Sequence, residues 1–274
     1  MKENLISIED IKKIHSIFRK SYGEKLARWI MKLGGLNYVN RVYDSGKYET
    51  GTDIEDAMLD KGVGIKRMVH NIEVLKQFDG QPFITVSNHP YGHIDGIMLV
   101  GEVAKIRSDF KVMVNWMLGL IDTMEDHFIG VNPYSSGSLS ERSSLAGVKE
   151  CIQHLKENHP LGFFPAGAVS KNKIIKIEDR EWQDGVIKLI QKAKVPVIPV
   201  YISGQNSWLF NFLDLIDWRL RTVRLCHELN NKKGKTIHMV FGEPITVEEQ
   251  KKFSDTKLLG SFLKEKTYNL KSTL

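Results

Sequence analysis

A histidine and an aspartate lie close together in the segment Ser87–Gly96. This segment directly follows the apolar run Phe83–Ser87, which is typical of a buried strand. A neutral imidazole can accept a proton at neutral pH, and a neighbouring carboxylate fixes its tautomer and stabilises the imidazolium. The pair His89 and Asp95 therefore predicts general-base catalysis where the strand opens onto a helix.

The same segment allows a metal site. His89, His93 and Asp95 could supply three ligands at short spacing, as in a metal-dependent hydrolase. Pro90 suits the first turn of a helix, and Gly92 permits a bend that a side chain would resist. Both residues disfavour a regular helical face carrying two histidines, so the metal hydrolase stays the alternative.

A second polar turn follows the apolar run Leu161–Phe164. A strand that ends in Pro165-Ala166-Gly167 turns sharply and exposes backbone N–H groups, which suit an anionic head group or an oxyanion. Lys171 and Lys173 come next and could bind an anion as point charges, or simply face solvent. No serine lies in a Gly-x-Ser-x-Gly elbow, so the reacting hydroxyl is expected on the substrate.

The segment Asn88-His89, followed by Asp95, resembles the catalytic motif of the glycerolipid and lysophospholipid acyltransferase family. The usual family spacing places four residues between His and Asp, and this sequence has five. The longer form is similar to the bacterial branch often labelled hemolysin-like, which includes enzymes that O-acylate lyso-ornithine and lyso-glycine lipids. The resemblance implies that His89 is the general base and Asp95 its partner, and it leaves His93 without a role.

Three further blocks occur in the family's order. Phe128–Pro133 resembles the second block but lacks its frequent arginine, and Val195–Val200 matches the fourth, whose two prolines indicate an edge or irregular strand. Gly162–Ser170 resembles the third block, commonly Phe-Pro-Glu-Gly-Thr-Arg-Ser. Here alanine replaces the Glu and the Thr, and Val169 replaces the Arg, so the guanidinium that would grip a phosphate monoester is lost.

The resemblance implies an O-acyltransferase that moves a fatty acyl chain from an acyl-carrier-protein or coenzyme A thioester to a lyso-lipid hydroxyl. The missing arginine favours an amino-acid or zwitterionic head group, and a 1-acylglycerol-3-phosphate acyltransferase is the alternative. No metal or bound cofactor is required, and backbone N–H groups near Gly167 are expected to stabilise the oxyanion. The expected substrate-binding residues are Asn88, Pro165, Gly167, Ser170, Lys171 and Lys173.

Strand-like runs alternate with helical patterns from about residue 70 onward. They predict an α/β fold, a mixed and largely parallel sheet flanked by helices. Helical spacing before that predicts an N-terminal helical segment over residues 1–65, with the acyltransferase domain over 66–274. The expected strands are Phe83–Ser87, Phe110–Val114, Phe128–Val131, Leu161–Phe164, Val195–Ile202 and Ile237–Phe241.

Several helical stripes define the expected core. Apolar positions are Leu26, Ile30 and Leu33 in one helix, Leu145, Val148, Ile152 and Leu155 in a second, and Trp182, Val186, Leu189, Ile190 and Ala193 in a third. A capping-box pattern at Thr246–Glu249 starts the last helices.

Two stretches could contact a membrane. Lys25, Arg28 and Lys32 share a helix with Trp29, and residues 204–213 are rich in apolar side chains. Packing against the protein is the alternative for both stretches.

The composition fits a globular protein of 274 residues, 42% of them hydrophobic, with a net charge of +6. The positive charge favours an anionic surface but is spread along the chain, which disfavours nucleic acid and leaves a non-catalytic anionic-surface binder as the weakest alternative. Cys151 and Cys226 are expected to be reduced thiols of a cytoplasmic protein. With no signal peptide or transmembrane helix expected, the predicted location is peripheral, on the cytoplasmic face of the inner membrane.

Overall fold

The computed structural model describes residues 3–14, 16–20, 22–115, 122–131, 138–173 and 176–274. Contacts within the chain divide it into two compact units. The first unit comprises residues 1–66, 121–123 and 206–235, and the second comprises residues 67–120, 124–205 and 236–274.

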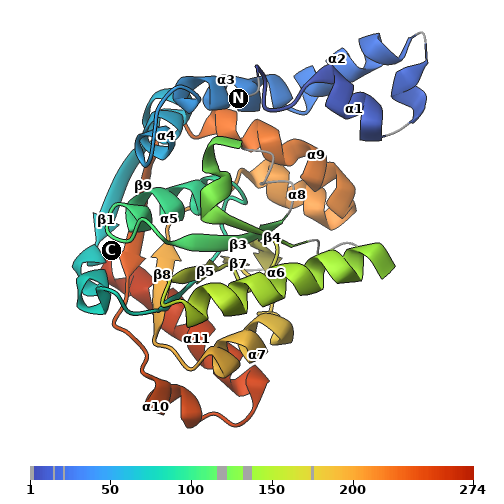
Figure 1. Cartoon of the computed structure of the whole chain (residues 1–274). Coiled ribbons are helices and arrows are strands. Elements are labelled where there is room, and N and C mark those ends of the chain that lie inside the picture. The colour runs from blue at the N-terminus through green and yellow to red at the C-terminus, as the bar shows by residue number, and fades with distance from the viewer. Residues whose placement is uncertain (1–2, 15, 21, 116–121, 132–137, 174–175) are drawn as a thin grey trace. The chain divides into compact units, whose positions relative to one another are not determined.

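The second unit is built on a mixed sheet (Figure 1). Within the described residues the strands lie in the order β1-β9-β8-β2-β5-β3-β4. β8, β2, β5, β3 and β4 are parallel, and β9 is antiparallel to β8. The strands are β1 (Lys66–His70), β2 (Ile84–Ser87), β3 (Lys111–Asn115), β4 (Phe128–Val131), β5 (Leu161–Phe163), β8 (Val197–Ile202) and β9 (Thr236–Phe241).

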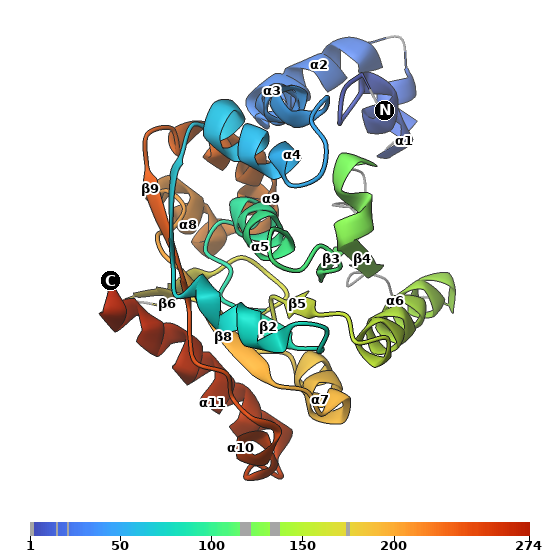
Figure 2. The ribbon, with the colours of Figure 1, turned by 60° about the vertical axis from the view of Figure 1, so that its left-hand side comes forward.

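Helices cover both faces of this sheet, which confirms the predicted fold class. α6 (Ser138–Lys156), α7 (Asp184–Ala193) and α11 (Thr256–Asn269) lie on one face, and α5 (Ile94–Ala104) lies on the other (Figures 1 and 2). Every residue of β2 and β8 is buried, as expected for central strands covered twice. α10 (Val247–Lys251) begins at the predicted capping box, in which Thr246 and Glu249 bond reciprocally.

The first unit is helical, as predicted for the N-terminal segment. Its helices are α1 (Ile8–Ile14), α2 (Gly23–Leu33), α3 (Leu36–Gly46), α4 (Asp53–Asp56) with a π-helical turn at Ala57–Val63, α8 (Trp208–Ile216) and α9 (Trp218–Glu228). The two contact units divide the chain differently from the predicted division after residue 65. α9 packs on α3 and α8 packs on α9, so residues 206–235 belong with the N-terminal helices.

Two predicted stripes are partly wrong. In α2 the buried residues are Gly23, Ala27 and Met31, while Leu33 is exposed, because Ala27 and Met31 form the face that packs with Ile11 of α1. In α6 the exposed Leu145 and Ile152 flank a narrower buried stripe that contains Cys151 and Leu155. The predicted stripe of α7 is confirmed, with all of its residues buried except the half-buried Ala193.

The sequence did not predict three short strands that are rich in polar residues. β1 carries three basic side chains, and β6 (Lys171–Lys173) and β7 (Lys176–Glu178) form an antiparallel pair. Pro199 lies in the internal strand β8, although the two prolines of this block predicted an edge or irregular strand. Its ring faces Gly242, immediately after β9 ends, where a Cβ would lie 2.8 Å from the proline Cγ.

Candidate active site

The segments carrying the predicted chemistry meet at one edge of the sheet. β2 and β5 are parallel neighbours, so the loop containing His89 and the turn after Phe163 leave the sheet at the same end. In parallel sheets, loops at the carboxyl ends of strands commonly build the binding site.

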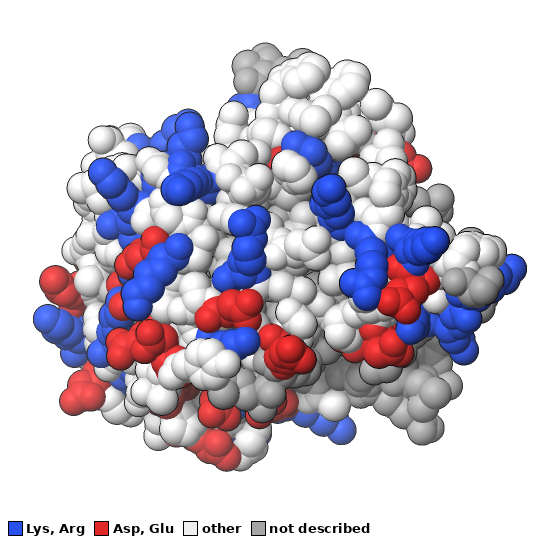
Figure 3. Space-filling view, turned by 90° about the horizontal axis from the view of Figure 1, so that it is seen from above, with Lys and Arg blue, Asp and Glu red and all other residues white. Residues whose placement is uncertain are grey.

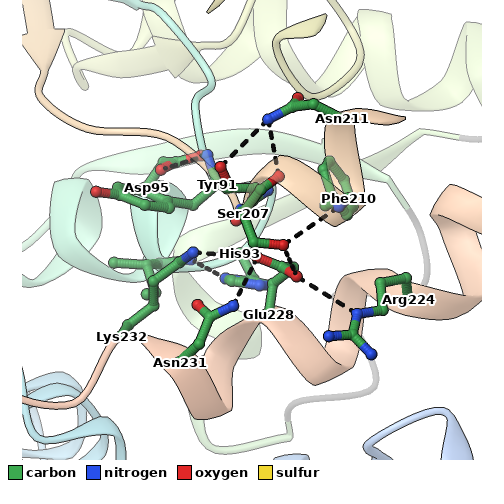
Figure 4. A network of polar contacts seen from close by, with 12 residues as sticks. Tyr91, His93, Asp95, Ser207, Phe210, Asn211, Arg224, Glu228, Asn231 and Lys232 are labelled. Carbon is green, nitrogen blue, oxygen red and sulfur yellow. Dashed lines mark hydrogen bonds and ion pairs between the residues drawn. The ribbon is translucent and has the colours of Figure 1, made fainter. Parts of the chain in front are cut away.

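The loop after β2 brings His89 and Asp95 together. Nδ1 of His89 lies 2.7 Å from Oδ2 of Asp95, although the ring is not aligned for a linear hydrogen bond. Asp95 is fully buried in the first turn of α5, and its Oδ2 accepts N–H bonds from Gly92 at 2.8 Å and from Tyr91 at 3.0 Å (Figure 4). Gly92 adopts a φ of 86°, which lets the loop fold back. The predicted contact between carboxylate and imidazole is present.

The imidazole remains reachable. The His89 side chain is 16% exposed, and its Nε2 has no hydrogen-bond partner among the described residues. The Phe164 ring packs against it at 4.4 Å between centroids and limits its tilt. A hydroxyl that approaches from solvent can therefore meet Nε2 while Asp95 occupies the other side of the ring.

Pro90 does not lie in the helix that the sequence suggested, and His93 caps a helix where a metal ligand was the alternative. Pro90 lies in the irregular loop, and α5 begins only at Ile94. His93 is the N-cap residue, because its Nδ1 accepts the N–H of Ile94 at 2.8 Å. In the part of the chain that the structure describes, no group of three His, Cys, Asp or Glu residues is placed to hold a metal ion. This arrangement counts against the metal-hydrolase alternative.

Asn88 has a structural task where substrate binding was predicted. Its Nδ2 donates to the carbonyl of Ile202 at 2.8 Å, and its Oδ1 accepts the N–H of Ile202 at 2.7 Å. The amide is buried and closes the end of β8. Asn88 therefore places the residue next to it, His89, relative to the sheet.

The Pro-Ala-Gly turn is present, but its donors are not those expected. The N–H of Gly167 donates to the carbonyl of Phe164 at 2.9 Å and is used within the turn. The carbonyl of buried Pro165 accepts the N–H of Gln183 at 2.9 Å. The N–H groups of Ala166 and Ala168 have no partner among the described residues. Ala166 is buried and Ala168 is half-buried, so Ala168 is the more accessible donor of the two.

Ser170 is likewise held inside the protein. It is buried, its N–H donates to the carbonyl of His89 at 2.8 Å, and its hydroxyl donates to Asp179 at 2.6 Å. Lys171 is exposed and has no ion pair with any described residue. The side chain of Lys173, and Asn132 and Pro133 of the second block, lie outside what the structure describes.

Asp179 belongs to this site and was not predicted. It follows β7, is fully buried, and accepts the N–H of His89 at 3.2 Å. Burial raises the pKa of its carboxyl above the ordinary range. No motif marks it in the sequence. Its only signal is an acidic residue three positions before Trp182, whose indole N–H also donates to it at 3.2 Å.

Comparisons with known proteins identify the family of this chain. The model of the acyltransferase family matches residues 23–274. A lyso-glycine lipid O-acyltransferase from Bacteroides thetaiotaomicron is 26% identical over 276 residues, covering 97% of both chains. One of the same name from Phocaeicola vulgatus is 25% identical, covering 97% of this chain and 95% of the relative.

A solved structure shares the fold. The 1-acyl-sn-glycerophosphate acyltransferase PlsC from Thermotoga maritima superimposes with a TM-score of 0.54 at 15% identity, over 89% of this chain and 95% of that one. The family match covers nearly the whole chain and includes the His89–Asp95 loop and the turn after β5. The chain therefore belongs to the acyltransferase family and is an acyl-transferring enzyme.

Proposed function

We propose that this enzyme transfers a fatty acyl chain from the thioester of acyl carrier protein or coenzyme A to the hydroxyl of a lyso-lipid. The contact between His89 and the buried Asp95, with Nε2 left open, carries the proposal. The relatives named lyso-glycine lipid O-acyltransferase support the class of acceptor.

In the proposed cycle, Nε2 of His89 takes the proton of the acceptor hydroxyl. The oxygen attacks the thioester carbonyl, and the N–H of Ala168 donates to the oxyanion of the tetrahedral intermediate. Collapse of the intermediate forms the ester and expels the thiolate, which receives the proton from the imidazolium. Asp95 holds Nδ1 and stabilises the imidazolium throughout.

The acceptor's head group is proposed to carry an amino acid. Val169 lies at the position where the family commonly has an arginine, which would bind a phosphate monoester through two hydrogen bonds. Lys171 offers only a single exposed point charge near the site. A second candidate is a glycerophosphate acceptor. It is favoured by a Brassica napus relative named 1-acyl-sn-glycerol-3-phosphate acyltransferase, 24% identical over 64% of this chain and 52% of the relative.

The enzyme is proposed to work at a membrane surface, on the cytoplasmic face. Among the described residues, no helix has the length and hydropathy needed to cross a bilayer. α8 instead presents Trp208, 75% exposed, and Leu215, 66% exposed, together with Leu209, Phe212 and Ile216. The first unit, to which α8 belongs, has 18 Lys and Arg against 14 Asp and Glu. Exposed apolar side chains on a cationic unit suit an anionic lipid surface.

The surface charge gives little support to nucleic-acid binding. On the face drawn in Figure 3, basic side chains are interspersed with acidic ones and form no continuous stripe. Nucleic-acid sites concentrate basic residues along one face or element. A lipid acceptor therefore remains the proposed partner.

The test measures acyl transfer with purified protein, acyl donors of both kinds and lyso-glycine lipid or lysophosphatidic acid, with products read by mass spectrometry. His89→Ala is expected to lose about 10²–10⁴-fold in rate, the usual cost of removing a general base. His93→Ser keeps a capping side chain and serves as the control that retains activity. Full transfer by His89→Ala contradicts the proposal, and loss of activity with chelator and in His93→Ser supports the metal hydrolase.

A further inference from the structure

A buried carboxylate behind the catalytic loop has no part in the proton transfer described above. Both oxygens of Asp179 accept hydrogen bonds, Oδ1 from the hydroxyl of Ser170 at 2.6 Å and Oδ2 from Nε1 of Trp182 at 3.2 Å. Oδ1 also accepts the N–H of His89, which lies 90 residues earlier in the chain. A fully buried carboxylate is costly unless neighbouring donors compensate it, so its retention here calls for a reason.

Asp179 and Ser170 together hold both backbone groups of His89. The N–H of His89 donates to Asp179 at 3.2 Å, and the carbonyl of His89 accepts the N–H of Ser170 at 2.8 Å. The hydroxyl of Ser170 closes the ring by donating to the same oxygen of Asp179. The backbone from which the imidazole projects is thus fixed by residues outside its own loop, while the Asp95 carboxylate lies against Nδ1 of the ring.

Asp179 is in turn anchored to α11. Its N–H donates to the hydroxyl of Tyr268 at 2.8 Å, and its carbonyl accepts from Nζ of Lys264 at 2.8 Å. Burial raises the pKa of Tyr268, so this phenol stays neutral. The carboxylate is therefore held by a regular helix packed on β8 and β2, and its position does not depend on the catalytic loop.

We propose that Asp179 is a positioning residue for acyl transfer, which holds the backbone of His89 in register with Asp95. This proposal rests on the proposed function of His89. A misplaced catalytic group costs rate even when the misplacement is about 1 Å.

The main test is Asp179→Asn, which keeps the size of the side chain and an acceptor oxygen but removes the charge. We expect kcat to fall about 10- to 100-fold, with KM for both substrates little changed. The other charged and titratable groups around the pair are unchanged in this variant; they are Asp95, Glu178, Arg180, Lys264 and Tyr268.

The control is Glu102→Gln, which removes the charge of another largely buried carboxylate, paired with Arg67 and seven residues beyond Asp95 in α5. It should leave kcat and both KM values unchanged. If Asp179→Asn does not fold, Ser170→Ala removes only the hydroxyl donor to Asp179 and should lower kcat by less, with KM little changed. An unchanged kcat in the folded variant overturns the proposal.

A measurement without substrate separates this proposal from the proposed function. NMR of labelled histidine at one fixed pH, with the His89 signal assigned by its loss in His89→Asn, reports the surroundings of the ring directly. We expect this signal to move in Asp179→Asn and to stay in place in Glu102→Gln. If the parent transfers no acyl group, the proposed function fails while the NMR shift still tests the positioning. An unshifted signal overturns the positioning role, whatever the activity.

Discussion

Asn88 and Ile202 exchange two hydrogen bonds, at 2.8 and 2.7 Å, across 114 residues of chain. The asparagine amide extends the hydrogen bonding of the sheet by one residue, because it pairs with both backbone groups of the last residue of β8. The residue that follows it is His89, so the catalytic loop starts from a fixed point on the central strands. This pairing is why a polar residue is buried beside the general base.

Removing this amide is expected to destabilise the second unit. Asn88→Ala leaves the buried N–H and carbonyl of Ile202 without partners, at about 1–3 kcal/mol for each group. The free energy of unfolding, measured by urea denaturation, should fall by about 2–4 kcal/mol. The exposed Asn269, changed to alanine, is the control and should stay within about 0.5 kcal/mol of the parent. Equal free energies of unfolding for the two variants would show that the pairing of Asn88 with Ile202 does not stabilise the fold.

The exposed Lys171 is expected to affect binding of the acceptor and not the chemistry. Lys171→Gln should raise KM for an acidic lyso-lipid about two- to fivefold and leave kcat unchanged, because an exposed charge contributes little and is screened by salt. The effect should shrink at high salt in steady-state assays. Lys188→Gln, on the exposed side of α7, is the matched control. A fall in kcat with unchanged KM would contradict the assignment of Lys171 to the head group.

The apolar surface of α8 predicts lipid binding. In the double variant Leu215→Ser with Ile216→Ser, sedimentation with anionic phosphatidylglycerol vesicles should weaken about tenfold or more, since two exposed apolar side chains no longer enter the interface. Transfer to a detergent-dispersed acceptor should be unchanged.

Leu258→Ser is the matched control for α8, because this leucine is 60% exposed but lies on α11 in the second unit. It should bind vesicles as the parent does. If both changes weaken binding equally, general surface hydrophobicity is responsible and α8 has no special role.

Glu228 predicts a pH dependence of stability in the first unit. Burial raises the pKa of this carboxyl, but hydrogen bonds from Asn231 and Ser207 and the charge of Lys232 outweigh it and lower the pKa to about 2 (Figure 4). Because the folded-state pKa lies below the ordinary value of 4.5, the stabilisation is present above that value. It is lost as the pH falls from 4.5 toward 2.

Denaturation of Glu228→Gln at several pH values measures this dependence. The variant should be less stable than the parent by about 1.5–3 kcal/mol at neutral pH, the range for hydrogen bonds to a charged group, and the difference should narrow in acid. Glu9→Gln removes an exposed carboxylate paired with Lys12 and should show little difference at any pH. A constant deficit of Glu228→Gln from neutral to acid pH would mean that the charge is not the cause.

The two cysteines are expected to resist alkylation. Burial raises the pKa of Cys151 to about 12 and that of Cys226 to about 11, so the reactive thiolate is scarce near neutral pH. Iodoacetamide labelling followed by mass spectrometry should be slow in the folded enzyme and fast in urea. Rapid labelling of the folded protein at either cysteine would show that the local structure opens.

The sequence alone determined the features that depend on near neighbours in the chain. His89 and Asp95 are separated by five residues, so a short loop with a glycine at its bend brings them together. Alternating apolar runs and helical stripes likewise predicted the central strands, since burial on both faces demands continuous apolar residues.

Tertiary structure alone decided the features that join distant segments. Asp179 reaches His89 across 90 residues, Asn88 reaches Ile202 across 114, and α9 joins the N-terminal helices; none of these contacts leaves a local pattern in the sequence. The exposure of Leu145 and Leu33 was missed for a related reason. Helical spacing shows which side chains share a face, whereas the width of the buried stripe depends on what packs against it.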